Sequence, residues 1–169
     1  MIVPLAFQLI YKELDSTFVV SGIITITFGV LFFLSNIDHL KSINTQQAFL
    51  LTALSWLSIA VFGSLPFFFS ELNLSITDSF FESMSGITTT GATILSNIEN
   101  SPKGILIWRA MLQWLGGIGI VVMAITILPL LKVGGMQLFK MEGPDSTEKI
   151  LPRTIEVATI IISTYIILT

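Results

Sequence analysis

The sequence predicts an all-α integral membrane protein, in which a helix–re-entrant loop–helix unit follows one to two further transmembrane helices. Of its 169 residues, 53% are hydrophobic and only 11% are charged, whereas soluble domains carry about 25% charged residues. The hydrophobic residues also gather in uncharged stretches of the length that a spanning helix needs, about 20 residues. A helix is the expected form because lipid offers no partner to an open backbone.

Three uncharged stretches are long enough to span a membrane. They are residues 16–34, residues 42–70 with their apolar part at 48–69, and residues 110–131. Two shorter apolar stretches, 1–11 and 157–169, stand at the ends of the chain. Both are predicted to be parts of interrupted helices, so the chain is expected to be a piece of something longer.

The positive residues predict the orientation. Loops 35–45 and 132–153 share one side of the membrane and hold Lys41, Lys132, Lys140, Lys149 and Arg153. The other side holds Lys12 and Lys103, with Arg109 just inside the third span. Because cytoplasmic loops carry the excess of Lys and Arg, the first side is predicted to be cytoplasmic.

The composition argues against several kinds of site. Cysteine is absent, so no disulfide or thiolate metal site is expected, and a single histidine, His39, argues against histidine clusters. The net charge is −3 with no basic run suited to nucleic acid. The sequence also lacks a sensibly placed Ser/His pair and paired intramembrane carboxylates, which weakens an intramembrane enzyme as an interpretation.

The segment between the second and third spans, residues 75–97, does not read as a plain loop. Ser75 is predicted to cap a short helix, and Asp78 three residues later resembles a capping box. Gly86 is a natural stop. A helix over 75–85 would be about 15 Å long, half the thickness of a membrane. Its apolar face would consist of Phe80, Phe81 and Met84.

A threonine-rich string follows that helix, with the sequence GITTTGAT at residues 86–93. Three consecutive β-branched residues disfavour helix and favour extended backbone, and Gly91 permits a positive φ. Extended backbone at membrane depth persists only where protein or a water-filled cavity covers it. The segment is therefore predicted to be a re-entrant pore loop, the alternative being an extracellular loop with a threonine-rich turn. Carbonyl oxygens of such loops replace the hydration shell of K⁺.

Three stretches carry a family resemblance. They read FFESMSGITTTGAT at 80–93, QWLGGIGI at 113–120 and LPLLKVGGMQL at 128–138. In this order they resemble the first pore loop, the start of the helix after it and the stretch leaving that helix in the Trk/Ktr/HKT potassium transporter family. The resemblance is closest to the bacterial TrkH-type members, and it covers nearly the whole chain.

The resemblance implies a fold of the K⁺-channel-like superfamily, with four covalently linked helix–pore loop–helix repeats around one pore after two extra helices. Residues 1–41 then correspond to the extra N-terminal transmembrane helices, the first of them truncated. Residues 42–135 correspond to the first repeat, and residues 136–169 to a cytoplasmic linker and the truncated start of the second. Since one loop supplies a quarter of the coordination shell, this chain is expected not to conduct by itself.

The resemblance also implies a function, potassium uptake across the bacterial plasma (inner) membrane by a multi-pass protein. Backbone oxygens of Thr89, Thr90, Gly91 and Ala92 would line the selectivity filter, with Thr88 as a further candidate. K⁺ would be the transported ion, with no covalent cofactor. The implied partners are membrane lipid, the remaining pore repeats, a TrkA-like cytosolic nucleotide-binding regulatory subunit and a second copy in a homodimer, but no nucleic acid. The alternative is a non-conducting truncated fragment or structural membrane protein.

Arg109 is the only charged residue in the sequence between Lys103 and Lys132. Its role can be interpreted in two ways. Its side chain either snorkels to the outer interface or forms an ion pair with Glu82 that braces the pore helix against the third span, since charged groups in membranes pair or reach water. The sequence leaves both open. Nearby, Gly116, Gly117 and Gly119 are expected to serve close helix packing.

Overall fold

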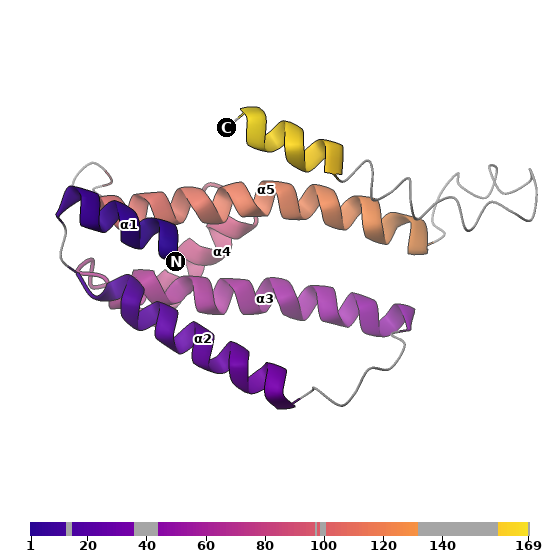
Figure 1. Ribbon diagram of the computed structural model, residues 1–169, viewed down its shortest axis with the longest axis horizontal. Coiled ribbons are helices and arrows are strands. Elements are labelled where there is room, and N and C mark those ends of the chain that lie inside the picture. Colours follow the sequence, from indigo (N-terminus) through magenta and orange to yellow (C-terminus); the bar gives the residue numbers. More distant parts are fainter. Residues whose placement is uncertain (13–14, 36–43, 97, 99–100, 132–158, 169) are drawn as a thin grey trace, which may run out of the picture. The chain divides into compact units, whose positions relative to one another are not determined.

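The computed structural model describes residues 1–12, 15–35, 44–96, 98, 101–131 and 159–168. Its helices are α1 (Ile2–Tyr11), α2 (Thr17–Ser35), α3 (Thr45–Phe69), α4 (Ile76–Ile87) and α5 (Lys103–Leu131) (Figure 1). A shorter apolar helix covers Thr159–Leu168. The chain divides into two compact units, Met1–Gly116 and Gly117–Thr169. The candidate site lies in the first unit, and most of the predicted 136–169 segment lies outside the described residues.

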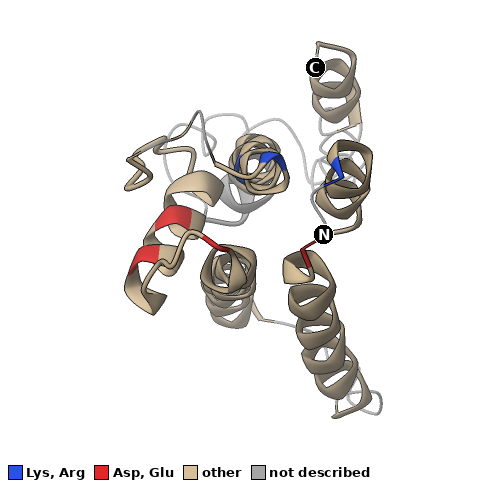
Figure 2. Cartoon of the chain, turned by 90° about the vertical axis from the view of Figure 1, so that its left-hand side faces the viewer, with Lys and Arg blue, Asp and Glu red and all other residues tan. Residues whose placement is uncertain are grey.

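Three helices among the described residues are long and apolar enough to cross a membrane: Thr17–Ser35, Gln46–Phe69 and Lys103–Val121. They confirm the three predicted spans. The third helix begins at Lys103 rather than at residue 110. The prediction placed its start too late because it was based on an uncharged stretch, and the first turns of the helix include Lys103 and Arg109. Figure 2 shows α2 and α3 free of charged residues along their length, whereas α4 and α5 carry them. On α2, large apolar side chains such as Ile26 and Phe33 are exposed, as lipid contact requires.

The core of the first unit joins three helices. Its buried residues come from α2, α3 and α5 and are Phe18, Phe67, Ile105, Trp108 and Leu112. The Trp108 ring meets the Phe18 ring edge to face, with centroids 6.1 Å apart. The indole Nε1 of Trp108 donates a hydrogen bond of 2.9 Å to the carbonyl oxygen of Gly63. A buried indole N–H needs such a partner, so this bond fixes α5 against α3.

Helix α4 packs against α3 with its polar face inward. The buried residues of α4 are Ser79, Glu82, Ser83, Ser85, Gly86 and Ile87. Gly63 of α3 makes room for this face, because a Cβ atom there would lie 2.6 Å from Ser83 Oγ. By contrast Ile76 and Phe81 are exposed. Phe80 and Met84 of the predicted apolar face are half-buried, so the described chain covers the apolar side of this helix only in part.

Candidate functional site

Helix α4 begins as the sequence predicts and ends two residues later. The Ser75 hydroxyl accepts a hydrogen bond of 3.1 Å from the backbone N–H of Asp78, which confirms the N-cap. The predicted stop at Gly86 is wrong, since α4 continues to Ile87. Gly86 instead allows close packing, because a Cβ atom there would lie 3.1 Å from Leu112 Cβ on α5.

The end of α4 is a Schellman motif with threonine in the glycine position. The N–H of Thr89 donates to the carbonyl oxygen of Gly86 and the N–H of Thr90 to that of Ser85, both at 3.0 Å. This pair of bonds requires a left-handed residue at Thr89, whose φ is 56°. The prediction of extended backbone is therefore wrong at Thr88 and Thr89. Their N–H groups instead donate hydrogen bonds to carbonyl oxygens at the end of the helix. A β-branched residue in this region carries strain of about 1–3 kcal/mol.

The same hydrogen bonds set the direction of three successive carbonyl groups. The N–H groups of Thr89, Thr90 and Gly91 all point back to carbonyl oxygens of α4. In a trans peptide the C=O points opposite to the N–H. The oxygens of Thr88, Thr89 and Thr90 are therefore turned away from the helix end. Thr89 and Thr90 are exposed and Thr88 is half-buried, and the peptide geometry places the row of three main-chain oxygens on the outward side of the loop, away from α4.

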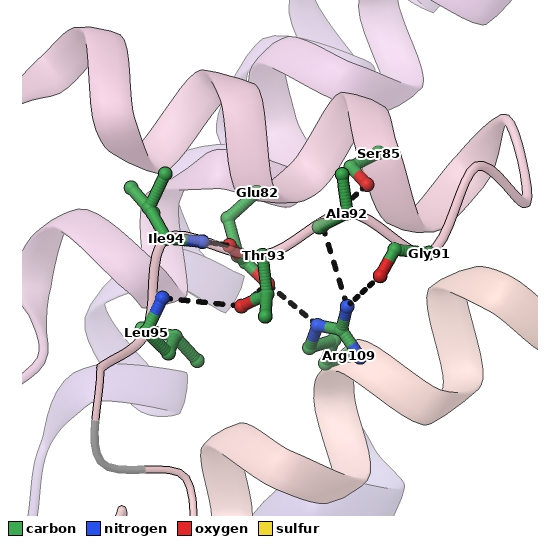
Figure 3. Close-up of polar contacts among 8 residues, drawn as sticks. All are labelled: Glu82, Ser85, Gly91, Ala92, Thr93, Ile94, Leu95 and Arg109. Carbon is green, nitrogen blue, oxygen red and sulfur yellow. Dashed lines mark hydrogen bonds and ion pairs between the residues drawn. The ribbon is translucent and has the colours of Figure 1, made fainter.

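Beyond Thr90 the chain runs back along α4 without regular structure as far as Leu95. Gly91 has the predicted positive φ, 78°. The carbonyl oxygens of Gly91 and Ala92 accept hydrogen bonds from Arg109 Nη2 at 3.1 and 3.4 Å (Figure 3). The oxygen of Ala92 also accepts one from Ser85 Oγ at 2.6 Å. Of the four oxygens predicted to line a filter, those of Thr89 and Thr90 thus face outward and the other two face protein donors.

Glu82 stands at the centre of the contacts that hold this returning segment. Its side chain is fully buried. Oε1 accepts hydrogen bonds from Arg109 Nε at 2.5 Å and Thr93 Oγ1 at 2.8 Å, and Oε2 accepts one from the N–H of Ile94 at 3.1 Å (Figure 3). The structure therefore contains the ion pair that was one of the two interpretations of Arg109. Because hydrogen bonds to charged groups are about twice as strong as neutral ones, this carboxylate joins α4, the returning segment and α5.

The sequence prediction gave two residues of the site no role in holding the loop. Ser85 holds the carbonyl of Ala92, and its position three residues after Glu82 on one helix was a usable signal, since such residues share a face. Gly116 was expected only to allow close packing, which is confirmed, but its contact is specific. A Cβ atom at Gly116 would lie 2.0 Å from the carbonyl oxygen of Ile87, the last residue of α4.

Comparison with known proteins shows which family this chain belongs to. The family model of the TrkH cation transport proteins matches residues 14–169. The chain is 44% identical over 166 residues to the Trk system potassium uptake protein TrkI of Halomonas elongata, covering 98% of this chain and 34% of that protein. It is 42% identical over 173 residues to TrkH of Escherichia coli K12, covering 100% of this chain and 36% of that protein.

A solved structure gives the same result. The crystal structure of the potassium transporter TrkH from Vibrio parahaemolyticus matches with a TM-score of 0.80 and 34% sequence identity, over 98% of this chain and 33% of that chain. The chain therefore spans about a third of the length of these relatives. The predicted resemblance and the predicted helix–loop–helix fold are both confirmed. The chain belongs to the TrkH family of cation transport proteins.

Proposed function

We propose that this chain supplies one pore repeat of a potassium uptake pathway. In it, Thr88, Thr89, Thr90, Gly91 and Ala92 form one quarter of a selectivity filter, with the main-chain oxygens of this segment as the candidate ligands of the ion. The observation that carries this proposal is the outward row of carbonyl oxygens from Thr88 to Thr90, fixed by hydrogen bonds to the end of α4. Rings of such oxygens replace the hydration shell of K⁺. The named activity of the relatives, potassium uptake, supports transport rather than catalysis.

The dimensions of α4 support a loop that enters the membrane part of the way. Its 12 residues give a length of about 18 Å, against about 30 Å for the hydrocarbon core. The C-terminal end of the helix carries partial negative charge, and the carbonyl row begins there. A cation at the row is therefore favoured by both the oxygens and the helix end.

The exposed surfaces of the loop support a pore made from several repeats. Thr89 and Thr90 are exposed, and the apolar side chain of Phe81 on α4 is 45% exposed. In the proposed pore, the remaining repeats of a TrkH-like protein cover these surfaces and complete the filter. The assembly lies in the bacterial inner membrane, with the pore loop entering from the outside. A TrkA-like cytosolic nucleotide-binding subunit and a second copy of the intact protein are the partners that the family resemblance favours.

The test uses a chimera, called the TrkH chimera below, in which residues 1–169 of this chain replace the matching segment of Escherichia coli TrkH. It is expressed in a strain that lacks its own potassium uptake systems. We expect growth at limiting K⁺ and uptake that prefers K⁺ over Na⁺, whereas residues 1–169 alone give neither. A chimera that reaches the membrane in normal amount but takes up no K⁺ would favour the alternative, a non-conducting membrane protein.

A further inference from the structure

The guanidinium group of Arg109 faces a carboxylate and two main-chain oxygens of the loop at once. Its Nε binds Glu82, which is fully buried, and its Nη2 binds the oxygens of Gly91 and Ala92. The side chain of Arg109 is 20% exposed. A charged group thus occupies the side of the loop where two of the proposed filter oxygens would otherwise be available to an ion.

We infer that Arg109 is a specificity-determining residue, which withholds the oxygens of Gly91 and Ala92 from the permeating ion while Glu82 cancels its positive charge. The inference rests on the proposed function and deepens it. In this repeat the ion is then bound by the oxygens of Thr88, Thr89 and Thr90, next to the end of α4. An ion-binding position beyond these three oxygens receives few ligands from this repeat.

The electrostatic part of the inference follows from the short distances. A guanidinium 3.1 Å from the oxygen of Gly91 lies close enough to repel a cation bound at the neighbouring oxygens, and the repulsion is strong where protein excludes water. Glu82 carries the opposite charge 2.5 Å from Arg109 Nε. The pair together is neutral, so each member alone shifts the affinity for K⁺ in the opposite direction.

The experiment measures the KM for K⁺ uptake by variants of the TrkH chimera. We expect Glu82→Gln to raise KM roughly tenfold, because it leaves the charge of Arg109 uncompensated near the ion. Arg109→Gln should lower KM and weaken the preference for K⁺ over Na⁺, because it leaves a net negative charge and releases two oxygens. The double variant should return KM toward that of the unsubstituted chimera, since the local charge is again neutral, while the preference for K⁺ over Na⁺ stays weakened because the two oxygens remain released.

The signs of these shifts separate the inference from a merely structural brace. If the pair only holds the loop in place, both single variants change KM in the same direction, and that result would overturn the inference. Should Glu82→Gln fail to accumulate in the membrane, the direction of the Arg109→Gln shift decides alone. A rise in KM for Arg109→Gln counts against the inference.

Two further variants complete the test. Arg109→Lys keeps the positive charge but cannot bind Glu82 and both loop oxygens at once, so KM should change less than in Arg109→Gln while the preference for K⁺ over Na⁺ still falls. Asp78→Asn removes a carboxylate from the same helix, one turn before Glu82, and should leave KM unchanged within about twofold. An equal rise in Asp78→Asn and Glu82→Gln would show a general surface effect and overturn the inference. Failure of the unsubstituted chimera to take up K⁺ contradicts the proposed function instead.

Discussion

Glu82 of α4 and Arg109 of α5, which lie 27 positions apart in the sequence, form an ion pair in which Arg109 Nε is 2.5 Å from Glu82 Oε1. The carboxylate is fully buried and also binds Thr93 and Ile94. A charge in such a place is tolerated only when it is paired and its remaining lone pairs are satisfied. The pair therefore depends on the returning segment as much as the segment depends on the pair.

Removing one member of this pair should destabilise the protein more than removing both. Glu82→Gln leaves Arg109 without its charged partner beside the loop. We therefore expect a loss of about 3 kcal/mol in the free energy of unfolding. Arg109→Gln leaves a buried carboxylate with a similar loss. The double variant should lose less than the sum by about 1–3 kcal/mol. Unfolding of the purified TrkH chimera in detergent measures these values, and strictly additive losses would count against an energetic pair.

A side chain at Gly91 should disturb the loop because the position has a φ of 78°. Residues with a Cβ atom rarely adopt this conformation. We expect Gly91→Ser to lower the selectivity of the TrkH chimera for K⁺ over Na⁺, measured as the ratio of uptake rates. Gly29→Ser is the matched control, because a Cβ atom at Gly29 of α2 meets nothing within 4 Å. Equal ratios in both variants would contradict a role of Gly91 in the filter.

The helices could be predicted from the sequence because each depends on a local pattern. Uncharged stretches near 20 residues gave α2, α3 and α5, and the cap at Ser75 gave the start of α4. The end of α4 could not be predicted in the same way. Gly86 looks like a stop locally, but the close approach of Leu112 determines its use. That contact joins residues 26 positions apart, so no local sequence pattern predicts it.

The residues of the candidate site could be predicted from the sequence, but the directions of their carbonyl groups could not. The string from Thr88 to Ala92 was found from its β-branched and glycine content. Which carbonyls face outward depends on the hydrogen bonds at the end of α4 and on Arg109. Arg109 itself had two interpretations, because the distance to Glu82 follows only from the packing of α5 against α4. The orientation in the membrane and the roles in ion binding stay predictions.

The contact between Gly116 and Ile87 leaves no room for a side chain. A Cβ atom at Gly116 would lie 2.0 Å from the carbonyl oxygen of Ile87 and 2.8 Å from its carbonyl carbon. Since these are backbone atoms, the end of α4 has to move. We expect Gly116→Ala to abolish K⁺ uptake by the TrkH chimera and to lower the free energy of unfolding by about 1–3 kcal/mol.

The control for this change is Gly22→Ala on α2, where a Cβ atom meets nothing within 4 Å. It should leave uptake unchanged and stabilise the helix slightly, since alanine has the higher helix propensity. Uptake assays and detergent unfolding are run on both variants in parallel. Normal uptake by Gly116→Ala would show that the loop does not depend on this contact.

Two buried serines of α4 offer a matched pair for testing whether the helix holds the returning segment. The hydroxyl of Ser85 donates to the carbonyl oxygen of Ala92 at 2.6 Å. The hydroxyl of Ser79 has no hydrogen-bond partner among the described residues. Both residues are buried, so replacement by alanine removes the same atom from similar surroundings, with the bond to Ala92 as the difference.

We expect Ser85→Ala to lose about 1 kcal/mol in the free energy of unfolding, because Ala92 keeps only its longer bond to Arg109. Freed from Ser85, that part of the loop gains mobility, and the preference of the TrkH chimera for K⁺ over Na⁺ should fall. Ser79→Ala should be neutral or stabilising, since it removes an unsatisfied hydroxyl. The two variants are compared by unfolding in detergent and by the ratio of K⁺ to Na⁺ uptake. If Ser79→Ala lowers that ratio as much as Ser85→Ala, buried volume rather than the hydrogen bond to Ala92 accounts for the effect.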